Sequence, residues 1–206
     1  MEKPKIITNK GLDKLLGILS NVDRNKSIPN PTAQYSTLCL PDNELESVNM
    51  RVWITCNSLK QSNPTLYIIL TLQMSYGLRI SEVLNLKGSD YRSYGKLFIS
   101  GLKFSQNRYI VINELDYFFK MYKGSTSLIF SHISRFYVYR EYKKLGISFI
   151  FGNSKKSSVT HAPRHLTILQ AKENKIDTKD TQVFIGHKSI KSTEHYENKE
   201  KKKYKD

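Results

Sequence analysis

Residues 186–196, GHKSIKSTEHY, place a tyrosine close to histidines and lysines. Tyr196 follows His187 by nine residues, and Lys188 and Lys191 lie between them. A buried tyrosine needs no cationic neighbours, and an exposed tyrosine needs no partner at a fixed spacing. Histidine and cations around a tyrosine are the side chains that phosphate chemistry uses, because phosphate oxygens accept charge-assisted hydrogen bonds. The segment therefore raises the hypothesis of a tyrosine that acts on phosphate.

Three further segments carry side chains that can meet a phosphate. The first contains Arg79, and the second contains Lys103. The third is HAPRH, in which His161 and Arg164 are three residues apart and so share one face of a helix. Considered alone, Arg79 is explained as a surface arginine paired with Glu82, and Lys103 as one solvated lysine among many. The segments carry a functional signal only as a set.

The histidines also have to be weighed as zinc ligands. His161 and His165 are four residues apart, as in some metal sites, and His187 and His195 are further candidates. However, no glutamate follows His161 and no cysteine pair lies nearby, so the usual zinc motifs are missing. Arg164 would also place a positive charge beside the metal. We therefore expect neither a metal nor a cofactor.

In order and spacing, the four segments resemble the catalytic domain of the tyrosine recombinases, also called phage-type integrases. That family has an arginine in a G-L-R-x-S-E-x-x-x-L box and then a hairpin lysine. An H-x-x-R-H box follows, and then a G-H pair with a tyrosine nine residues later. The matching segments here are GLRISEVLNL, GLKFSQNR, HAPRH and GHKSIKSTEHY. Each box alone is a weak signal, but the resemblance covers roughly residues 40–200 in register.

Tyrosine attack on phosphate explains why the arginines are needed. A tyrosine hydroxyl has a pKa of about 10, so it is a poor nucleophile at neutral pH. Negative charge builds on the non-bridging oxygens during the attack, and two guanidiniums can stabilise it through parallel hydrogen bonds. Arg79 and Arg164 are the candidates. By resemblance, Tyr196 would form a 3′-phosphotyrosine link, which conserves the bond energy and requires neither ATP nor a metal.

The resemblance implies roles for the other residues and an activity. Lys103 would protonate the departing 5′ oxygen, and His161 would assist proton transfer at the tyrosine. His187 would hydrogen-bond the scissile phosphate. The implied activity is site-specific DNA recombination by integration, excision or resolution. Two alternatives remain: a type IB topoisomerase or telomere resolvase, and a DNA-binding remnant of the fold without recombination. The intact set of six residues argues against a remnant.

Hydrophobic patterning predicts the elements that must hold these residues. It indicates a mainly α-helical domain with a small antiparallel β-sheet, an α+β fold, and the resemblance implies that this is the fold of a tyrosine recombinase catalytic domain. Two alternating stretches, residues 96–100 and 108–112, predict a β-hairpin. The predicted helices cover residues 44–59, 64–76, 77–86, 114–123, 134–146 and 159–174, with one more amphipathic helix near Leu12 and Leu19.

Particular residues predict where these helices begin and end. Gly77 and Gly146 are placed to end two helices, and Asn174 to end a third in the left-handed conformation. Asn113 is placed to cap a helix start. Pro163 stands where the family usually has leucine, and proline is compatible with the first turn of a helix. We therefore expect a shifted helix entry rather than a lost site.

The boxes divide the chain into residues 1–40 and residues 41–206. We expect 1–40 to be a short N-terminal segment and 41–206 to be the catalytic domain with a basic tail, ENKEKKKYKD. Members of the family generally carry a separate helical core-binding domain that completes a clamp around DNA. Three interpretations of this difference are open: the clamp is reduced, a partner supplies it, or the protein is a remnant.

The charge of the chain indicates its partner. Lysine and arginine number 33 against 18 acidic residues, a net charge of +15, which favours a polyanion such as nucleic acid. No run approaches the ~18 apolar residues of a spanning helix, and Cys39 and Cys56 form no disulfide framework. We therefore expect an intracellular, DNA-associated protein with double-stranded DNA as its partner and no membrane. The resemblance implies a tetramer on DNA, and we expect a monomer in free solution.

Overall fold

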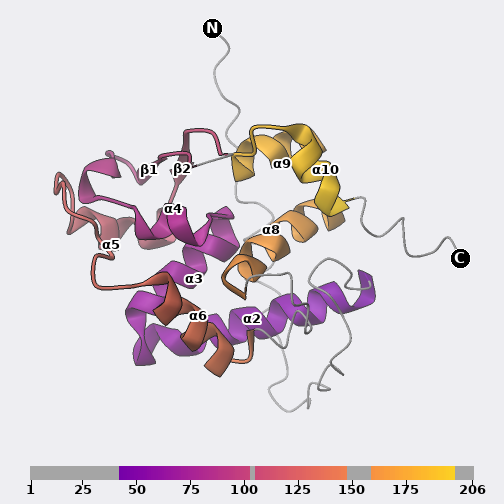
Figure 1. The fold of residues 1–206 in the computed structure, drawn as a ribbon, viewed down its shortest axis with the longest axis horizontal. Coiled ribbons are helices and arrows are strands. Elements are labelled where there is room, and N and C mark those ends of the chain that lie inside the picture. Colours follow the sequence, from indigo (N-terminus) through magenta and orange to yellow (C-terminus); the bar gives the residue numbers. More distant parts are fainter. Residues whose placement is uncertain (1–41, 103–104, 148–158, 198–206) are drawn as a thin grey trace, which may run out of the picture. The chain divides into compact units, whose positions relative to one another are not determined.

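Two long helices pack against each other at the start of the described chain. α2 covers Asp42–Ser62 and α3 covers Pro64–Tyr76 (Figure 1). The helix predicted for residues 44–59 is therefore confirmed, with two to three residues more at its ends. The computed structural model describes residues 42–102, 105–147 and 159–197, all within one compact unit. The helix predicted near Leu12 and the basic tail lie outside these residues.

Shorter helices follow in chain order. They are α4 (Ile80–Leu84), α5 (Asp116–Lys120), α6 (Arg135–Lys144), α8 (Ala162–Glu173), α9 (Thr178–Ile185) and α10 (Ile190–Glu197). Three 3₁₀ turns, Gly88–Asp90, Asn113–Leu115 and Val159–His161, connect them. No helix in the described ranges is long and apolar enough to cross a membrane. Hydrophobic spacing did not predict α9 and α10.

A two-stranded antiparallel sheet lies between α4 and α5 in the chain. β1 (Lys96–Ile99) pairs with β2 (Arg108–Val111) so that Leu97 faces Ile110 across the ladder. Both of these side chains are buried, since residues directly opposite each other in a ladder lie on the same face of the sheet. The predicted hairpin is confirmed. The mainly helical fold class with a small antiparallel sheet is confirmed as well.

Gly77 ends α3 as predicted. Its φ of 60° and ψ of 29° are left-handed, a conformation that costs other residues more than glycine. Gly146 also has a positive φ, 72°, just after α6. The prediction for Asn113 is wrong, because this residue begins a 3₁₀ turn and α5 starts only at Asp116.

The prediction that Asn174 ends α8 in the left-handed conformation is wrong, because the left-handed residue lies one position later. Asn174 has φ −76° and ψ 8°, so it is not left-handed, and its amide still donates to Gln170. Lys175 takes the left-handed conformation instead, with φ 55°. The Ile176 amide donates to the Ala171 carbonyl at 2.9 Å, a bond that closes the helix end around a left-handed residue.

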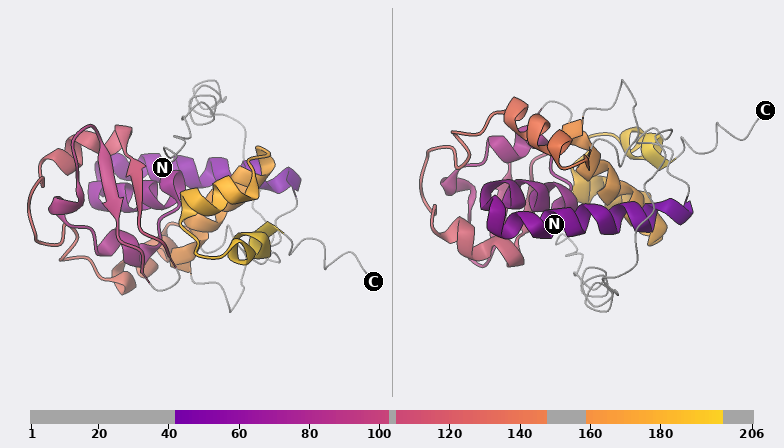
Figure 2. Two further views of the ribbon diagram at one scale, coloured as in Figure 1. Left: turned by 90° about the horizontal axis from the view of Figure 1, so that it is seen from above. Right: turned by 90° about the horizontal axis from the view of Figure 1, so that it is seen from below.

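The core holds together the elements that carry the predicted site. α2, α3 and α8 pack on one another, and Figure 2 shows the orange α8 beside the indigo α2 in both views. α9 and α10 pack on α8, and α4 packs on α3. Burying this apolar surface provides most of the driving force for folding. The fully buried side chains include Leu66, Ile69, Leu70, Leu72, Leu78, Ile80 and Leu97. The beginnings of α4 and α8 therefore meet at the end of α3.

Candidate active site

The turn after α3 places Arg79 at the start of α4. Left-handed Gly77 ends α3, and Arg79 is extended, with φ −70° and ψ 146°, as the residue before α4. The Arg79 amide donates to Glu82 Oε2 at 2.9 Å, and its Nη1 lies 3.4 Å from Glu82 Oε1. The predicted pair with Glu82 therefore exists, but it is no surface pair. The Glu82 side chain has no exposed area, whereas that of Arg79 is 20% exposed.

Arg164 reaches the same carboxylate from the beginning of α8. Its Nη1 lies 3.7 Å from Glu82 Oε2, and its side chain is buried. The guanidinium also donates to the carbonyls of Gly77 and Ile185, the second at 3.2 Å. Pro163 lies in the first turn of α8, so the helix accommodates it, as expected. These bonds fix Arg164 between the ends of α3 and α9.

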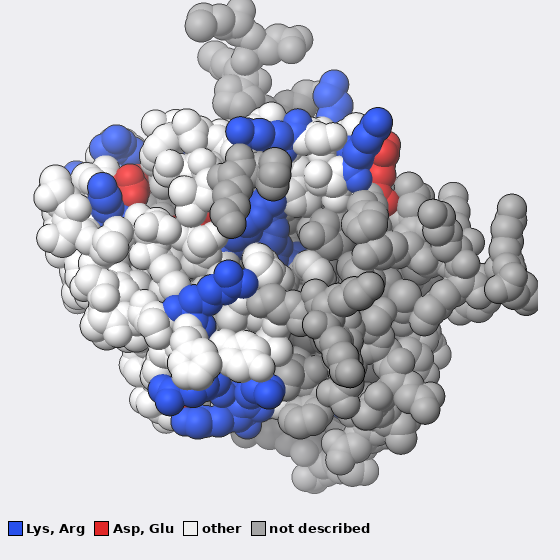
Figure 3. All heavy atoms as spheres, viewed as in Figure 1, with Lys and Arg blue, Asp and Glu red and all other residues white. Residues whose placement is uncertain are grey.

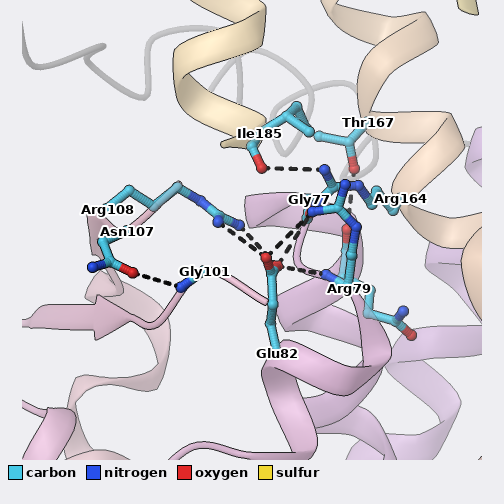
Figure 4. Close-up of polar contacts among 10 residues, drawn as sticks. Gly77, Arg79, Glu82, Gly101, Asn107, Arg108, Arg164, Thr167 and Ile185 are labelled. Carbon is cyan, nitrogen blue, oxygen red and sulfur yellow. Dashed lines mark hydrogen bonds and ion pairs between the residues drawn. The ribbon is translucent and has the colours of Figure 1, made fainter. Parts of the chain in front are cut away.

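Arg108 is a third arginine on Glu82, which the sequence analysis did not single out. From β2 it places Nη2 3.0 Å from Glu82 Oε2 and Nη1 3.3 Å from Oε1. Figure 4 shows the guanidiniums of Arg79, Arg108 and Arg164 converging on this one carboxylate. A sequence signal for Arg108 does exist, because it shares the inward side of its strand with buried Ile110 and Ile112.

The arginines keep Glu82 ionised. Burial of the carboxyl by itself would raise its pKa, but the hydrogen bond and charge of Arg108 and the charge of Arg164 lower the pKa below its usual value. Three guanidiniums and one carboxylate give this cluster a formal charge of +2. Such a cluster is suited to an anion whose oxygens accept several hydrogen bonds, such as a phosphodiester.

His161 lies at the edge of this cluster, immediately before α8. Its Nε2 is 3.4 Å from Nη2 of Arg135, the first residue of α6. Burial and, to a smaller extent, the positive charges of Arg135, Arg164 and Arg79 together lower the pKa of His161 to about 4. His161 is therefore neutral at pH 7 and can accept a proton. Arg135 is a second residue that sequence reasoning missed.

His187 lies in the turn between α9 and α10. The side chain is 2% exposed, and its Nδ1 is 3.0 Å from Oγ1 of buried Thr193 in α10. Burial, followed by the positive charges of the three arginines, lowers the pKa of His187 to about 3. This neutral histidine is therefore attached to α10 and lies within the electrostatic influence of the arginine cluster.

The hairpin turn is attached to the same histidine. Ser105 and His187 form an isolated antiparallel bridge, and the Gln106 amide donates to the Gly186 carbonyl at 2.9 Å. Lys103, the predicted hairpin lysine, lies outside the described residues. The described residues Ser105 and Gln106, which follow it in the chain, lie beside the turn that carries His187.

Tyr196 lies in α10, three residues after Thr193. Its side chain lies outside what the structure describes. Of the six predicted site residues, the structure thus brings Arg79, Arg164, His161 and His187 to one place and assigns Tyr196 to the adjoining helix. In the described ranges, no three histidine, cysteine or acidic side chains are grouped to hold a metal ion.

Known structures share this fold. The catalytic domain of bacteriophage HP1 integrase is 20% identical, with a TM-score of 0.54, over 80% of this chain and 88% of that one. XerH site-specific recombinase, bound to its palindromic difH substrate, is 17% identical, with a TM-score of 0.56, over 93% of this chain and 63% of that one. XerA recombinase is 21% identical, with a TM-score of 0.50, over 84% of this chain and 60% of that one.

The family assignment rests on the sequence. A search among curated proteins found no match to this chain. The family model described as the phage integrase family, however, matches residues 51–203, which is most of the chain and includes all four boxes. The resemblance seen in the boxes is thereby confirmed. The chain belongs to the phage integrase family, the enzymes that break and rejoin DNA.

Proposed function

We propose that the protein is a site-specific DNA recombinase that acts through a 3′-phosphotyrosine intermediate at Tyr196. Family membership supports the recombinase class. One observation carries the assignment of the site: Arg79 and Arg164 stand far apart in the sequence, yet both reach the buried carboxylate of Glu82. An arginine pair fixed in this way is suited to hold a phosphate while charge develops on its oxygens.

The first chemical step forms one bond and breaks one bond. The Tyr196 oxygen attacks phosphorus, and the bond from phosphorus to the 5′ oxygen of the next nucleotide breaks. Neutral His161 takes the tyrosine proton, and Lys103 gives a proton to the departing 5′ oxygen. A phosphate bound beside His161 offsets the positive charges that depress its pKa, which makes the histidine a better base in the complex. His187 hydrogen-bonds the phosphate.

The second step reverses the first with a different strand. A 5′ hydroxyl attacks the phosphotyrosine and gives its proton to Lys103, the bond to Tyr196 breaks, and protonated His161 returns a proton to the tyrosine. No net bond energy is lost, so no ATP is needed. Strand exchange requires two duplexes that are each cut on both strands. We therefore propose four protomers on DNA and a monomer in free solution, which light scattering of the free protein and of its DNA complex tests.

Double-stranded DNA is the proposed substrate. The net charge of +15 favours a polyanion, and the face in Figure 3 shows several groups of lysine and arginine with few acidic side chains among the described residues. α6 contributes Arg135, Arg140, Lys143 and Lys144. Its first residue contacts His161, so the basic side of α6 begins at the site. XerH is recorded on its difH DNA in a post-cleavage complex, which is consistent with this substrate class.

A suicide-substrate experiment tests the proposal. Nicked duplexes from the DNA that flanks the gene are incubated with the protein, and covalent protein–DNA adducts are counted on denaturing gels. Tyr196→Phe keeps the aromatic ring but removes the hydroxyl, so we expect DNA binding to survive and adducts to disappear. Tyr117→Phe is the matched control, because Tyr117 is 79% exposed and lies on α5.

Adduct formation should also persist in EDTA, since the proposed chemistry uses no metal. Adducts formed by Tyr196→Phe at the wild-type rate would assign the nucleophile to another residue. Complete inhibition by EDTA, reversed by zinc, would instead support a histidine-bound metal. Relaxation of supercoiled DNA without strand exchange between two sites would favour a topoisomerase.

A further inference from the structure

The arginine cluster contains one more cation than a two-arginine phosphate clamp requires, and that cation is Arg108. We propose that Arg108 is a positioning residue: it neutralises Glu82, so that Arg79 and Arg164 remain directed to the DNA phosphate. This inference rests on the proposed function, because it assigns a role within the same site. Arg108 itself is not proposed to touch DNA.

The distances rank Arg108 as the closest cationic partner of Glu82. It makes two hydrogen bonds to the carboxylate, at 3.0 and 3.3 Å, one to each oxygen. The Arg79 guanidinium makes a single longer contact at 3.4 Å. Arg164 lies 3.7 Å away, and its hydrogen bonds to Gly77 and Ile185 use carbonyl oxygens instead. A two-pronged bond of this kind is the strongest geometry available to a carboxylate.

Charge compensation explains why the strongest partner should be Arg108. A fully buried carboxylate is costly unless cations and donors satisfy it. Without Arg108, the nearest cations to Glu82 would be Arg79 and Arg164, already within 3.4 and 3.7 Å. Each of these two arginines would then interact more strongly with Glu82 and less strongly with the substrate phosphate. The surplus of positive charge in the cluster would also fall from two to one.

Arg108 also contacts the turn that carries His187. Its guanidinium lies against Gly186, where an added Cβ would stand only 2.5 Å from Nη1. Gly186 has a φ of 77°, so glycine suits this position for its conformation as well as for its size. One side chain thus links α4, β2 and the turn that carries His187.

The hairpin that bears Arg108 is held at this turn by its own backbone. The Gln106 amide donates to the Gly186 carbonyl, and Ser105 pairs with His187. Within the hairpin, the Gly101 amide donates to Oδ1 of Asn107 at 2.8 Å (Figure 4). Loss of the Arg108 side chain would leave these backbone contacts in place. A substitution of Arg108 therefore tests the charge of its side chain, because the backbone contacts still connect the hairpin to the turn that carries His187.

The experiment compares three variants with the wild type on the nicked substrate. For Arg108→Gln we expect the maximal rate of adduct formation to fall roughly tenfold to a hundredfold, the scale of a lost active-site donor. DNA affinity should change by less than about threefold, because the Arg108 side chain is buried on Glu82 and is not proposed to contact a DNA phosphate. Arg108→Lys keeps a charge but loses the two-pronged bond, so we expect an intermediate rate.

The third variant separates electrostatics from simple packing. Glu82→Gln combined with Arg108→Gln removes both charges and keeps two side chains that can bond to each other. Because no carboxylate then competes for Arg79 and Arg164, we expect this double variant to be faster than Arg108→Gln alone. If Arg108 served only to hold the fold, the double variant would be no faster than the single one, and the inference would be overturned.

A control and a second readout complete the test. Arg92→Gln also removes one charge, but the Arg92 guanidinium bonds the Ser89 carbonyl, so we expect a wild-type rate. Binding of inorganic phosphate to the free protein, followed by NMR titration, requires no cleavage, and Arg108→Gln should weaken it severalfold. If the wild type forms no adduct, the proposed function fails, while phosphate binding still tests Arg108. Unchanged phosphate binding in folded Arg108→Gln would refute the role of Arg108.

Discussion

At the scale of residues, Glu82 organises the site although it carries the wrong charge for binding DNA. A lone carboxylate beside the scissile phosphate would repel it. Here the carboxylate is fully buried and surrounded by the guanidiniums of Arg79, Arg108 and Arg164, whose charges outnumber its own. It can therefore orient arginines without presenting negative charge to a ligand. Arginine suits such a position better than lysine, because the planar guanidinium bonds both carboxylate oxygens and remains protonated.

The buried side chain of His187 gives the protein a predictable response to acid. The pKa of His187 is lowered to about 3, against about 6.5 in an unfolded chain. Between these values the unfolded chain binds more protons than the folded one, so stability falls as the pH drops below about 6.5. From about pH 7 to about pH 5, we expect His187 to account for a loss of roughly 1–2 kcal/mol in the free energy of unfolding.

Urea unfolding at the two pH values measures this loss. His187→Asn keeps an amide that can bond Thr193 but cannot titrate, so its stability should depend less on pH than that of the wild type. His132→Asn is the control, since His132 is exposed and outside the site. An equal acid response in wild type and His187→Asn would show that other groups cause it.

At the scale of elements, a buried polar chain aligns the helices around His161. The Tyr142 hydroxyl of α6 donates to Gln73 Oε1 of α3 at 2.7 Å. Gln73 Nε2 in turn donates to the carbonyl of Thr160 at 2.7 Å, one residue before His161. Buried polar groups specify position because each costs free energy when its partner is lost. The chain thus fixes the start of α8 relative to α3 and α6.

Tyr142→Phe tests this alignment. The ring keeps its packing in the core, but Gln73 Oε1 loses its buried donor. We expect the free energy of unfolding to fall by about 1–3 kcal/mol, as for other buried groups left without a partner. Chemical denaturation measures it, with Tyr109→Phe as a control because Tyr109 is 61% exposed. Equal stability of Tyr142→Phe and wild type would mean that the bond contributes little.

At the scale of the whole molecule, we expect the surplus of basic residues to determine how strongly the protein binds DNA. The net charge of +15 exceeds the charge of the arginine cluster by far, so most of it acts outside the site. Charges spread over a surface attract any duplex, because they respond to phosphates and not to base sequence. We therefore propose that the cluster serves catalysis and that the remaining basic surface provides general DNA affinity.

This division predicts a steep dependence of DNA binding on salt. Each neutralised phosphate releases roughly one counterion, so contact with about six to ten phosphates lowers affinity by ~10³–10⁵ between about 50 and 200 mM salt. Fluorescence anisotropy with a labelled duplex measures the slope. Arg108→Gln should leave this slope unchanged, because the Arg108 side chain is buried on Glu82. A flat dependence would mean that uncharged contacts dominate binding.

Local patterns in the sequence were enough for most of the elements. Apolar spacing predicted α2, α3, α6, α8 and the hairpin, and Gly77 marked the end of α3 correctly. These features depend on neighbours within a few residues, which periodicity and turn chemistry record directly. The end of α8 shows what local patterns do not predict. The left-handed residue there is Lys175 and not Asn174, because the last hydrogen bonds of a helix depend on its packing.

The sequence by itself determined the family and the candidate site residues, because the four boxes keep their order and spacing whatever the fold around them. Only the tertiary structure decided which charges meet. Nothing in the spacing of Arg108 connects it to Glu82, 26 residues earlier, or to the turn at Gly186. Arg135 and His161 are likewise joined only by folding. A buried carboxylate takes its partners from whatever chain segments the core brings within hydrogen-bonding distance, and that selection is made by long-range packing.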